Sequence, residues 1–595
     1  MRFRSKTTEG YTVYAVSGVN SISFAVDATK ADTKGLLGFA VERHDPQSNE
    51  RYFIKGFKVF KEFLQTPNEN TVVSTFENPV QSFVWDDFTG KPDHTYLYLF
   101  YPIKGQPKNL DRSGQPIEIK VQTEPLYSPT DEHDVFFNRG VASSQAYARQ
   151  FSNETPDKIE DPGKRKAVLD WLSRDLKTAF IAFIDQAQKG DTLLGCFYEF
   201  RYEEIAAAFK RAIDRGVKAR IIIDAKPNAA DFPRGENLAL ITSVGIPKKH
   251  IIQRKANPNN IQHNKFMVLL KGTAKTPAAV WTGSTNVSQG GLFGQTNVGH
   301  WVRNKKTAER FRDYWDLLSK DPGGTATDSR TEKIARNQAF KQAVVALQKD
   351  IEPDKLEAIP SGVTPIFSPR STSTMLTTYA RLLDSAKSYA GITLAFGIND
   401  VFKQLLVDNT ATDQLTFMLL EKRDQPAPGS TKKFTSLNAS NNTYQAHGAY
   451  IKDPLYQWTS EVNTKLLQLN QHVLYIHSKF MLIDPLGDEP IVVTGSANFS
   501  TASTTANDEN MLIIKGNKRV ADIYFTEFNR LFNHYYFRSV YEDQRTKKPT
   551  QPGSSSAPDP TQNSLFLLPN DDWLAKYQTG TLRYKRVEVF RKIKI

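Results

Sequence analysis

The 595-residue chain carries one short polar pattern twice, about two hundred residues apart. The first copy is His-Asn-Lys at 263–265, and a Gly-Ser-Thr-Asn block at 283–286 begins 20 residues after the histidine. The second is His-Ser-Lys at 477–479, and a Gly-Ser-Ala-Asn block at 495–498 begins 18 residues after its histidine. One His-x-Lys carries little information, but two copies with the same downstream block at nearly the same distance indicate a duplication. The pattern therefore predicts two similar halves that share one active site.

The periodicity around both copies predicts alternating helices and strands. In the first half we expect a helix over 167–188, a strand over 191–200, a helix over 202–215 and a strand over 219–224. In the second half we expect a helix over 375–389, a strand over 391–396, a helix over 400–407 and a strand over 414–421. Helices over 306–318 and 518–535 follow the two motifs in matching positions. This order predicts two α/β repeats, at 160–345 and 360–540, related by a pseudo-twofold axis.

The segments outside the two repeats have a different character. The pattern of residues 1–150 is typical of short alternating strands separated by turn residues, which predicts an all-β sandwich. Within it, the run 92–102 resembles a strand of a fibronectin type III or immunoglobulin-like module. Such a module could bind a protein or polymer partner, and deleting residues 1–145 would then leave activity on a small diester intact. A polar connection at 422–471 is a candidate lid, and 541–595 reads as a linker with a short basic C-terminal segment.

Charge is concentrated near the first motif. The chain has a formal net charge of +13, and residues 201–350 alone hold 26 basic and 13 acidic side chains. Between 251 and 300 there are five Lys or Arg and no Asp or Glu. A basic wall of this kind attracts an anionic substrate, although it can also be a solvated face without a ligand.

Other features of the sequence concern its location. The first ten residues contain no apolar stretch typical of a secretory signal, and no run is long enough to be a transmembrane helix. Cys196 is the only cysteine, which suits a reducing compartment, and we expect it to be a buried strand residue. These features predict a cytoplasmic protein.

The motif residues suit phosphoryl transfer. On a strand, residues i and i+2 share a face, so each His would project with its Lys, and each motif Ser with its Asn. Two lysines with amide and hydroxyl donors suit the nonbridging oxygens of a phosphodiester, while two histidines can supply a nucleophile and an acid. We see no obvious metal ligands in this set and expect no metal or cofactor. The predicted catalytic set includes His263, Lys265, Asn286, His477, Lys479 and Asn498.

These residues resemble the phospholipase D superfamily, whose pattern is His-x-Lys-x4-Asp followed by Gly-Ser-x-Asn. The second copy matches throughout, with Asp484 at the aspartate position and Glu509 eleven residues after Asn498. The first copy has Leu270 at the aspartate position and Asn297 at the position of the glutamate. Tyrosyl-DNA phosphodiesterases of this superfamily also lack the aspartate, and they pair an amide in one half with a carboxylate in the other.

The resemblance implies a phosphohistidine intermediate, no required metal and a further catalytic role for Glu509. We expect Glu509 to lie beside His477 and to make it the general acid, so that His263, facing an amide, is the nucleophile. Asn297 is the expected amide, with Gln295 as its competitor. The predicted substrate-binding residues are Ser284, Ser496, Gln295 and Asn297.

The resemblance leaves the substrate open. The basic stretch favours a nuclease that hydrolyses nucleic acid, with a phospholipase D acting on phospholipid head groups as the alternative. We see no amphipathic helix or exposed aromatic-rich loop for a bilayer. A chain that binds without cutting is a further alternative. One chain holds both half-sites, so dimerisation is not needed for the chemistry.

Overall fold

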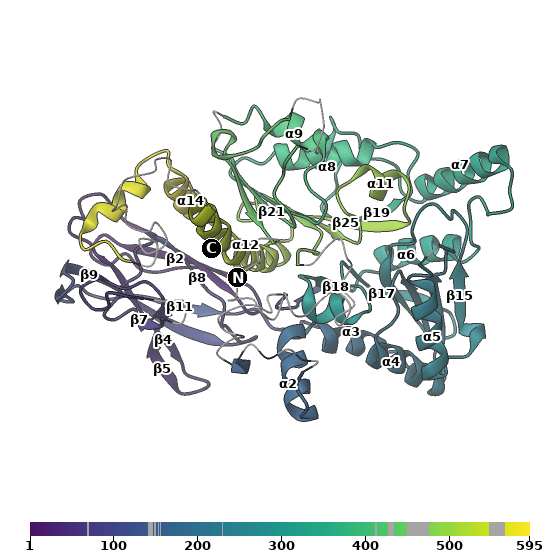
Figure 1. The fold of residues 1–595 in the computed structure, drawn as a ribbon, viewed down its shortest axis with the longest axis horizontal. Helices are drawn as coiled ribbons and strands as arrows, with labels where there is room; N and C mark the ends of the chain where they lie inside the picture. Colours follow the sequence, from purple (N-terminus) through teal and green to yellow (C-terminus); the bar gives the residue numbers. More distant parts are fainter. Residues whose placement is uncertain are drawn as a thin grey trace.

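The structure is a computed structural model of the chain. It describes residues 1–67, 71–140, 147, 150–152, 154, 156, 158–228, 230–410, 413–426, 434–448, 475–546 and 566–595. A β-sandwich lies at one end, and two α/β regions lie beside each other beyond it (Figure 1). This confirms the predicted multidomain fold, an all-β sandwich followed by two α/β repeats. The linker at 553–560 lies outside the described residues, as does most of the predicted lid.

The sandwich consists of two antiparallel sheets. One has the order β1 (Arg2–Arg4), β2 (Thr12–Ser17), β3 (Ile22–Asp27) and β8 (Val84–Asp87). The other has the order β10 (Asn109–Asp111), β9 (Thr95–Gln106), β4 (Gly38–Asp45) and β5 (Glu50–Phe53), and β11 (Ile117–Gln122) also pairs with β9. A small ladder joins β6 (Lys55–Gly56) to β7 (Val73–Ser74). Alternate residues of β9 are buried, so the period-two pattern of the sequence faces its aromatic side chains to the core.

The first repeat is built on a seven-stranded sheet. Its order is β12 (His133–Phe137), β18 (Val298–Val302), β17 (Thr276–Gly283), β16 (Lys265–Lys271), β13 (Thr192–Phe197), β14 (Lys218–Asp224) and β15 (Ile251–Arg254). Strand β12 belongs to this sheet, although it falls inside the range 1–150 that the sequence assigned to the sandwich. A short apolar strand looks the same in sequence whichever sheet it joins, so periodicity could not place it. The domain boundaries as a whole stay a prediction.

The second repeat has a sheet of the same design. Its order is β19 (Gly362–Ser368), β25 (Glu509–Lys515), β24 (Ile491–Gly495), β23 (Phe480–Ile483), β20 (Tyr389–Leu394), β21 (Leu415–Leu420) and β22 (Thr443–His447). Position by position, the two sheets have the same chain order and the same parallel or antiparallel pairing. The strands that follow the two His-x-Lys motifs, β16 and β23, both occupy the centre.

Helices cover both sheets. In the first repeat they are α2 (Pro162–Ser173), α3 (Leu176–Asp185), α4 (Glu203–Asp214), α5 (Arg234–Val244), α6 (Lys305–Leu318) and α7 (Arg330–Leu347). In the second they are α8 (Thr374–Asp384), α9 (Asp400–Leu406), α11 (Thr501–Thr505) and α12 (Lys518–Thr546). The single helix expected over 167–188 is instead split into α2 and α3, because Arg174 has φ of 51° and interrupts the helical backbone.

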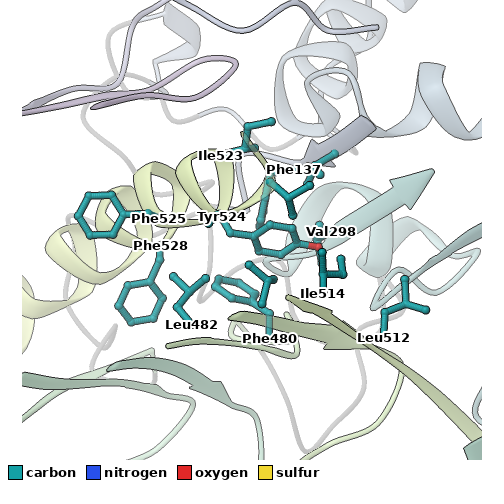
Figure 2. Close-up of a cluster of buried hydrophobic side chains, with 14 of the residues drawn as sticks. Phe137, Val298, Phe480, Leu482, Leu512, Ile514, Ile523, Tyr524, Phe525 and Phe528 are labelled. Carbon is teal, nitrogen blue, oxygen red and sulfur yellow. The ribbon is translucent and has the colours of Figure 1, made fainter. Parts of the chain in front are cut away.

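Helix α12 joins the parts of the molecule. In Figure 2 Tyr524 points toward Phe137 of the first repeat and Phe480 of the second, with ring centroids 5.2 Å away in both cases. One hydrophobic core therefore runs from the first sheet across α12 to the second.

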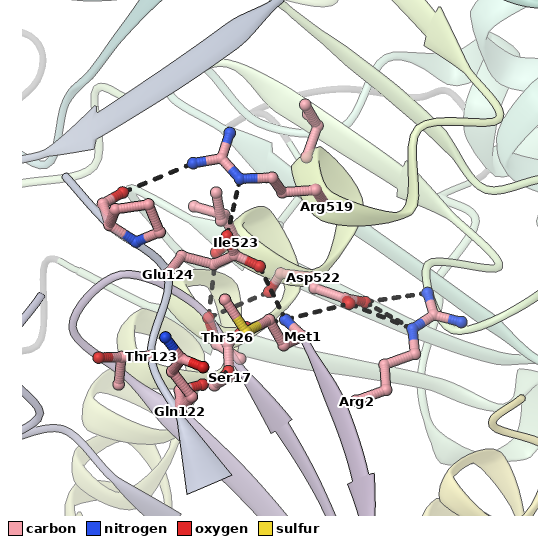
Figure 3. Close-up of polar contacts among 12 residues, drawn as sticks. Met1, Arg2, Ser17, Gln122, Thr123, Glu124, Arg519, Asp522, Ile523 and Thr526 are labelled. Atoms are coloured by element: carbon pink, nitrogen blue, oxygen red, sulfur yellow. Dashed lines mark hydrogen bonds and ion pairs between the residues drawn. The ribbon is translucent and has the colours of Figure 1, made fainter. Parts of the chain in front are cut away.

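The sandwich is attached to α12 by buried polar contacts. In Figure 3 Arg2 binds the carboxylate of Asp522 at 2.9 Å, and Arg519 binds Glu124 at 2.7 Å. The amino group of Met1 lies 3.0 Å from Glu124 and 3.5 Å from Asp522. Because these charges are mostly buried, each depends on its partner across the joint.

The C-terminal segment packs against the sandwich. It contains a 3-10 turn over Asp571–Tyr577 and α14 (Leu582–Arg591). The indole of Trp573 lies in the sandwich core and donates to the carbonyl of Leu36 at 2.8 Å. No helix in the described part of the chain is both long enough and apolar enough to cross a membrane.

Candidate active site

The two His-x-Lys segments meet where the repeats face each other. The ring centroids of His263 and His477 are 6.5 Å apart. Two parallel bridges hold this seam together, one between Gln262 and Asp508 and the other between Thr296 and Ile476. Each residue that precedes a motif histidine is thus bound to the opposite repeat, so the duplication builds one site from two halves.

Each histidine takes its polar partner from the other repeat. Nδ1 of His263 lies 2.9 Å from Oε2 of Glu509, and Nδ1 of His477 lies 2.9 Å from Oδ1 of Asn297. The expectation that Glu509 lies beside His477 is therefore wrong. The reason is the bridge between Gln262 and Asp508, because it brings the residues that follow them, His263 and Glu509, next to each other.

These contacts fix which ring nitrogen carries the hydrogen. Asn297 donates through Nδ2 to the carbonyl of Gly291 at 2.7 Å, so its Oδ1 faces His477 as an acceptor. A carboxylate oxygen likewise accepts from His263. In both rings Nδ1 therefore carries the hydrogen, and Nε2 is directed away from these partners.

The motif serines hold these same partners in place. The hydroxyl of Ser284 donates to Oδ1 of Asn297 at 2.8 Å, and that of Ser496 donates to Oε2 of Glu509 at 2.9 Å. Both serines are fully buried. These hydrogen bonds orient the amide and the carboxylate, and the expected contact of both serines with substrate stays a prediction.

The motif lysines are buried with their ammonium groups against the site. Nζ of Lys265 donates to the carbonyl of His263 at 2.6 Å, and Nζ of Lys479 donates to that of His477 at 2.6 Å. Burial lowers the pKa of Lys265 to about 7, against the opposing effect of Glu509, and it lowers the pKa of Lys479 well below its usual value. An anion bound here would attract the ammonium forms of Lys265 and Lys479 and so favour their protonation.

Burial also sets the charge of the other titratable groups. It lowers the pKa of His263 and of His477 well below the usual value, and the nearby Lys265 and Lys479 lower it further. Burial raises the pKa of Glu509 to about 7. Without a bound anion, both imidazoles are therefore neutral near pH 7.

The motif asparagines have unused hydrogen-bonding capacity. The side-chain oxygens of Asn286 and Asn498 are buried and have no hydrogen-bond partner within the described part of the chain. Because an amide group can turn over by rotation, each can present an oxygen or an NH₂ group there. The same orphan atom at equivalent positions of both repeats is what a site for a polar ligand requires.

Of the two amide candidates, Asn297 makes the contact with His477. Gln295 is also buried, and its backbone carbonyl accepts from Asn138 at 2.7 Å. Its expected role in substrate binding stays a prediction. Among the described residues, no group of three or more His, Cys, Asp or Glu side chains could hold a metal ion.

Sequence reasoning missed Tyr198, which lies beside the first histidine. Its ring centroid is 5.2 Å from that of His263, and Nζ of Lys265 is 5.5 Å from the same ring. Tyr198 follows strand β13, and β13 pairs with β16. A tyrosine just after a buried strand carries no distinctive sequence signal, so only the fold reveals it.

The structure also explains the aspartate that the first motif lacks. The carboxylate of Asp484 accepts from the backbone N–H groups of Lys387, Ser388 and Tyr389, where β20 begins. In the first repeat Asp191 performs the reciprocal task, accepting from Gly272 at 2.8 Å where β16 has ended. Asp484 in one repeat and Asp191 in the other thus connect strand ends away from the histidines. Because Asp191 does this in the first repeat, the site does not need an aspartate at the position of Leu270.

Comparison with known proteins agrees with this architecture. The family model described as "Cardiolipin synthase, PLD-like domain" matches residues 180–318 and 380–532, one region in each repeat. The chain therefore contains two PLD-like domains and belongs to the phospholipase D superfamily. It is an enzyme of the phosphodiesterase and transferase type that this superfamily comprises.

Several solved structures are similar to the chain. Phosphatidylserine synthase from Haemophilus influenzae Rd KW20 is 14% identical, with 71% of this chain and 94% of that chain covered and a TM-score of 0.40. Nuc from Salmonella typhimurium is 25% identical, with 24% and 87% covered and a TM-score of 0.20. Yeast tyrosyl-DNA phosphodiesterase is 11% identical, with 56% and 84% covered and a TM-score of 0.29. No curated protein sequence matches the chain.

Proposed function

We propose that the chain hydrolyses phosphodiester bonds of nucleic acid through a phosphohistidine formed on Nε2 of His263. The observation that carries this proposal is the crossed pairing of the histidines, with Glu509 on His263 and Asn297 on His477. Both pairings leave Nε2 for chemistry, but only His263 has a carboxylate behind it.

The carboxylate distinguishes the roles of the two histidines. When Nε2 of His263 bonds to phosphorus, its ring becomes positively charged, and Glu509 stabilises that charge. The imidazolium of His477 faces a neutral amide, so it gives up its proton more readily. His263 is accordingly the nucleophile and His477 the general acid.

The reaction then proceeds in two displacements. Once the anionic diester is bound, it raises the pKa of His477, whose Nε2 takes up a proton from solvent. Nε2 of His263 then attacks phosphorus, the bond from phosphorus to the leaving oxygen breaks, and His477 gives this Nε2 proton to that oxygen. A water molecule next loses a proton to His477 and attacks phosphorus, and the phosphorus–nitrogen bond breaks. Lys265, Lys479, Asn286 and Asn498 bind the nonbridging oxygens in both steps.

The basic character of the first repeat favours nucleic acid as the substrate. Residues 251–300 include five basic and no acidic side chains, and a polyanion gains from many such contacts. The alternative is cleavage of phospholipid head groups, which is favoured by the cardiolipin synthase description of the matched family model. The cytoplasmic location expected from the sequence stays part of this proposal, as does a partner for the sandwich.

The test compares both substrate classes in excess EDTA. Plasmid DNA, single-stranded DNA and RNA are assayed beside release of head groups from phosphatidylcholine vesicles. His263→Ala removes the nucleophile, and His250→Gln is the matched control, because His250 binds the carbonyl of Ala219 in the same repeat. EDTA-resistant cleavage of nucleic acid that is lost only in His263→Ala supports the proposal. Head-group release with intact nucleic acid would establish the lipid alternative instead.

A further inference from the structure

A buried ion pair lies directly behind the Glu509–His263 contact. Nε of Arg254 binds Oδ2 of Asp508 at 2.9 Å, and both side chains are 0% exposed. Asp508 precedes Glu509 in the chain, and Arg254 is the last residue of β15. The pair therefore ties the edge strand of the first sheet to the strand start that carries the carboxylate of the second repeat.

The backbone around Asp508 is part of the same junction. The carbonyl of Asp508 accepts from the N–H of His263 at 2.9 Å, and its own N–H donates to the carbonyl of Ile261 at 3.0 Å. Any shift of Asp508 thus moves both members of the Glu509–His263 pair. Arg254 is held in turn by Asp321, at 2.8 Å, and by the carbonyl of Pro322.

Among the residues of the second repeat that the structure describes, the positions that match Arg254 and Asp508 hold no ion pair. In the first repeat Arg254 lies opposite Asp224 on the neighbouring strand. In the second repeat Glu421 matches Asp224. Gly448 takes the place of Arg254, because it comes directly after His447, the partner of Leu420. The residue before Asn297, which matches Asp508, is Thr296. The ion pair is thus found on the side that holds a carboxylate against its histidine, and the amide side has a hydroxyl and a glycine.

We propose that Arg254 and Asp508 are a positioning pair that holds Glu509 against Nδ1 of His263, so that Nε2 of His263 faces the phosphorus. This inference rests on the proposed function of the same site. Neither residue contacts the reacting atoms, and both act through Glu509. A buried carboxylate that has lost its partner rearranges or attracts a proton, so the geometry depends on both charges.

The first test is kinetic and uses the full chain with bis(p-nitrophenyl) phosphate as the substrate. Asp508→Asn removes the charge next to Glu509, whereas Asp321→Asn, the matched control, removes the other carboxylate of Arg254. We expect Asp508→Asn to lower kcat about tenfold or more with KM nearly unchanged, because the loss is in the reacting geometry. Asp321→Asn leaves the contact between Arg254 and Asp508 in place, so its kcat should fall clearly less than that of Asp508→Asn. Equal kcat in Asp508→Asn and wild type, or equal losses in both variants, would overturn the inference.

A conservative variant covers the case in which Asp508→Asn does not fold. Arg254→Lys keeps the positive charge but lacks the planar fork that meets Asp508 and Asp321 together. A folded Arg254→Lys should show a lowered kcat with a near-normal KM, and wild-type kinetics in it would contradict the positioning role.

The second test needs no turnover. In protein labelled with ¹⁵N at histidine, the ring signals of His263, assigned with His263→Gln, report which nitrogen carries the hydrogen. We expect a single Nδ1–H form in wild type and in Asp321→Asn, and a mixture of forms in Asp508→Asn. Unchanged His263 signals in Asp508→Asn would refute the positioning pair, whereas a wild-type chain inactive on every diester would refute the proposed function alone.

Discussion

Glu509→Gln tests the crossed pairing most sharply, because it keeps an acceptor of the same shape and removes only the charge. Nδ1 of His263 would still donate to an amide oxygen at about the present position. What is lost is the extra stabilisation of the imidazolium that forms when Nε2 bonds to phosphorus. The two halves of the site would then resemble each other, with an amide on both histidines.

The magnitude follows from the type of hydrogen bond. A bond to a charged group contributes about 1.5–3 kcal/mol and a neutral one about 1 kcal/mol, so the change costs about 0.5–2 kcal/mol. This corresponds to a fall in kcat of about 2- to 30-fold. Since the carboxylate binds no substrate directly in this account, KM should stay nearly constant.

The pH profile supplies a second readout. Burial raises the pKa of Glu509 to about 7, so its carboxylate is ionised above pH 7 and protonated below it. The kcat of the wild type should therefore fall as the pH drops through about 7, and Glu509→Gln should lack this dependence. Steady-state kinetics on a diester between pH 5 and 9 measures both effects. Unaltered kcat and an unaltered profile in Glu509→Gln would refute the role of the carboxylate.

Three further predictions follow from other contacts. Asn297→Asp places a carboxylate beside His477, which raises the pKa of that ring and makes it a weaker acid. The kcat should therefore fall about tenfold, most strongly for diesters with poor leaving groups. Equal losses for good and poor leaving groups would contradict the acid role. Glu527→Gln breaks buried bonds to Arg174 and Arg530, each at 2.8 Å, and should cost about 3–5 kcal/mol of unfolding free energy in urea. The two arginines lower the pKa of Glu527 to about 2. The stabilisation by Glu527 is therefore complete above the pKa that Glu527 has in the unfolded chain, and it is lost as the pH falls through about 2. Equal unfolding free energies of wild type and Glu527→Gln at pH 7 would contradict this prediction. Deletion of residues 1–145 should abolish folding and with it activity, because it removes strand β12 and the partners of Asp522 and Arg519. A truncated chain with full activity on a small diester would instead show that the repeats fold alone.

The repeats and their motifs could be predicted from the sequence because their signals are local. A His-x-Lys before an apolar strand, and a Gly-Ser-x-Asn block after it, each occupy a few consecutive residues. Helices such as α4 and α6 begin and end within a few residues of the predicted bounds, since their apolar spacing is regular. The duplication then implied one sheet design used twice, which the matching strand orders bear out.

The partners of the histidines could not be predicted in this way. Whether Glu509 faces His477 of its own repeat or His263 of the other depends on how the two sheets meet, and no local pattern records that. Arg254 and Asp508 are 254 residues apart in the chain, and Tyr198 follows an unremarkable strand. Contacts of this kind depend on the seam between repeats, so they emerge only from the assembled fold.

Trapping the covalent intermediate shows directly which histidine is the nucleophile. The wild type and His263→Ala are mixed with a diester labelled with ³²P, stopped with base and digested, because a phosphohistidine survives base and is lost in acid. We expect label on the wild-type peptide that contains His263, and no label in His263→Ala. Label on the peptide that contains His477 would contradict the assignment of the nucleophile and the role given to Glu509.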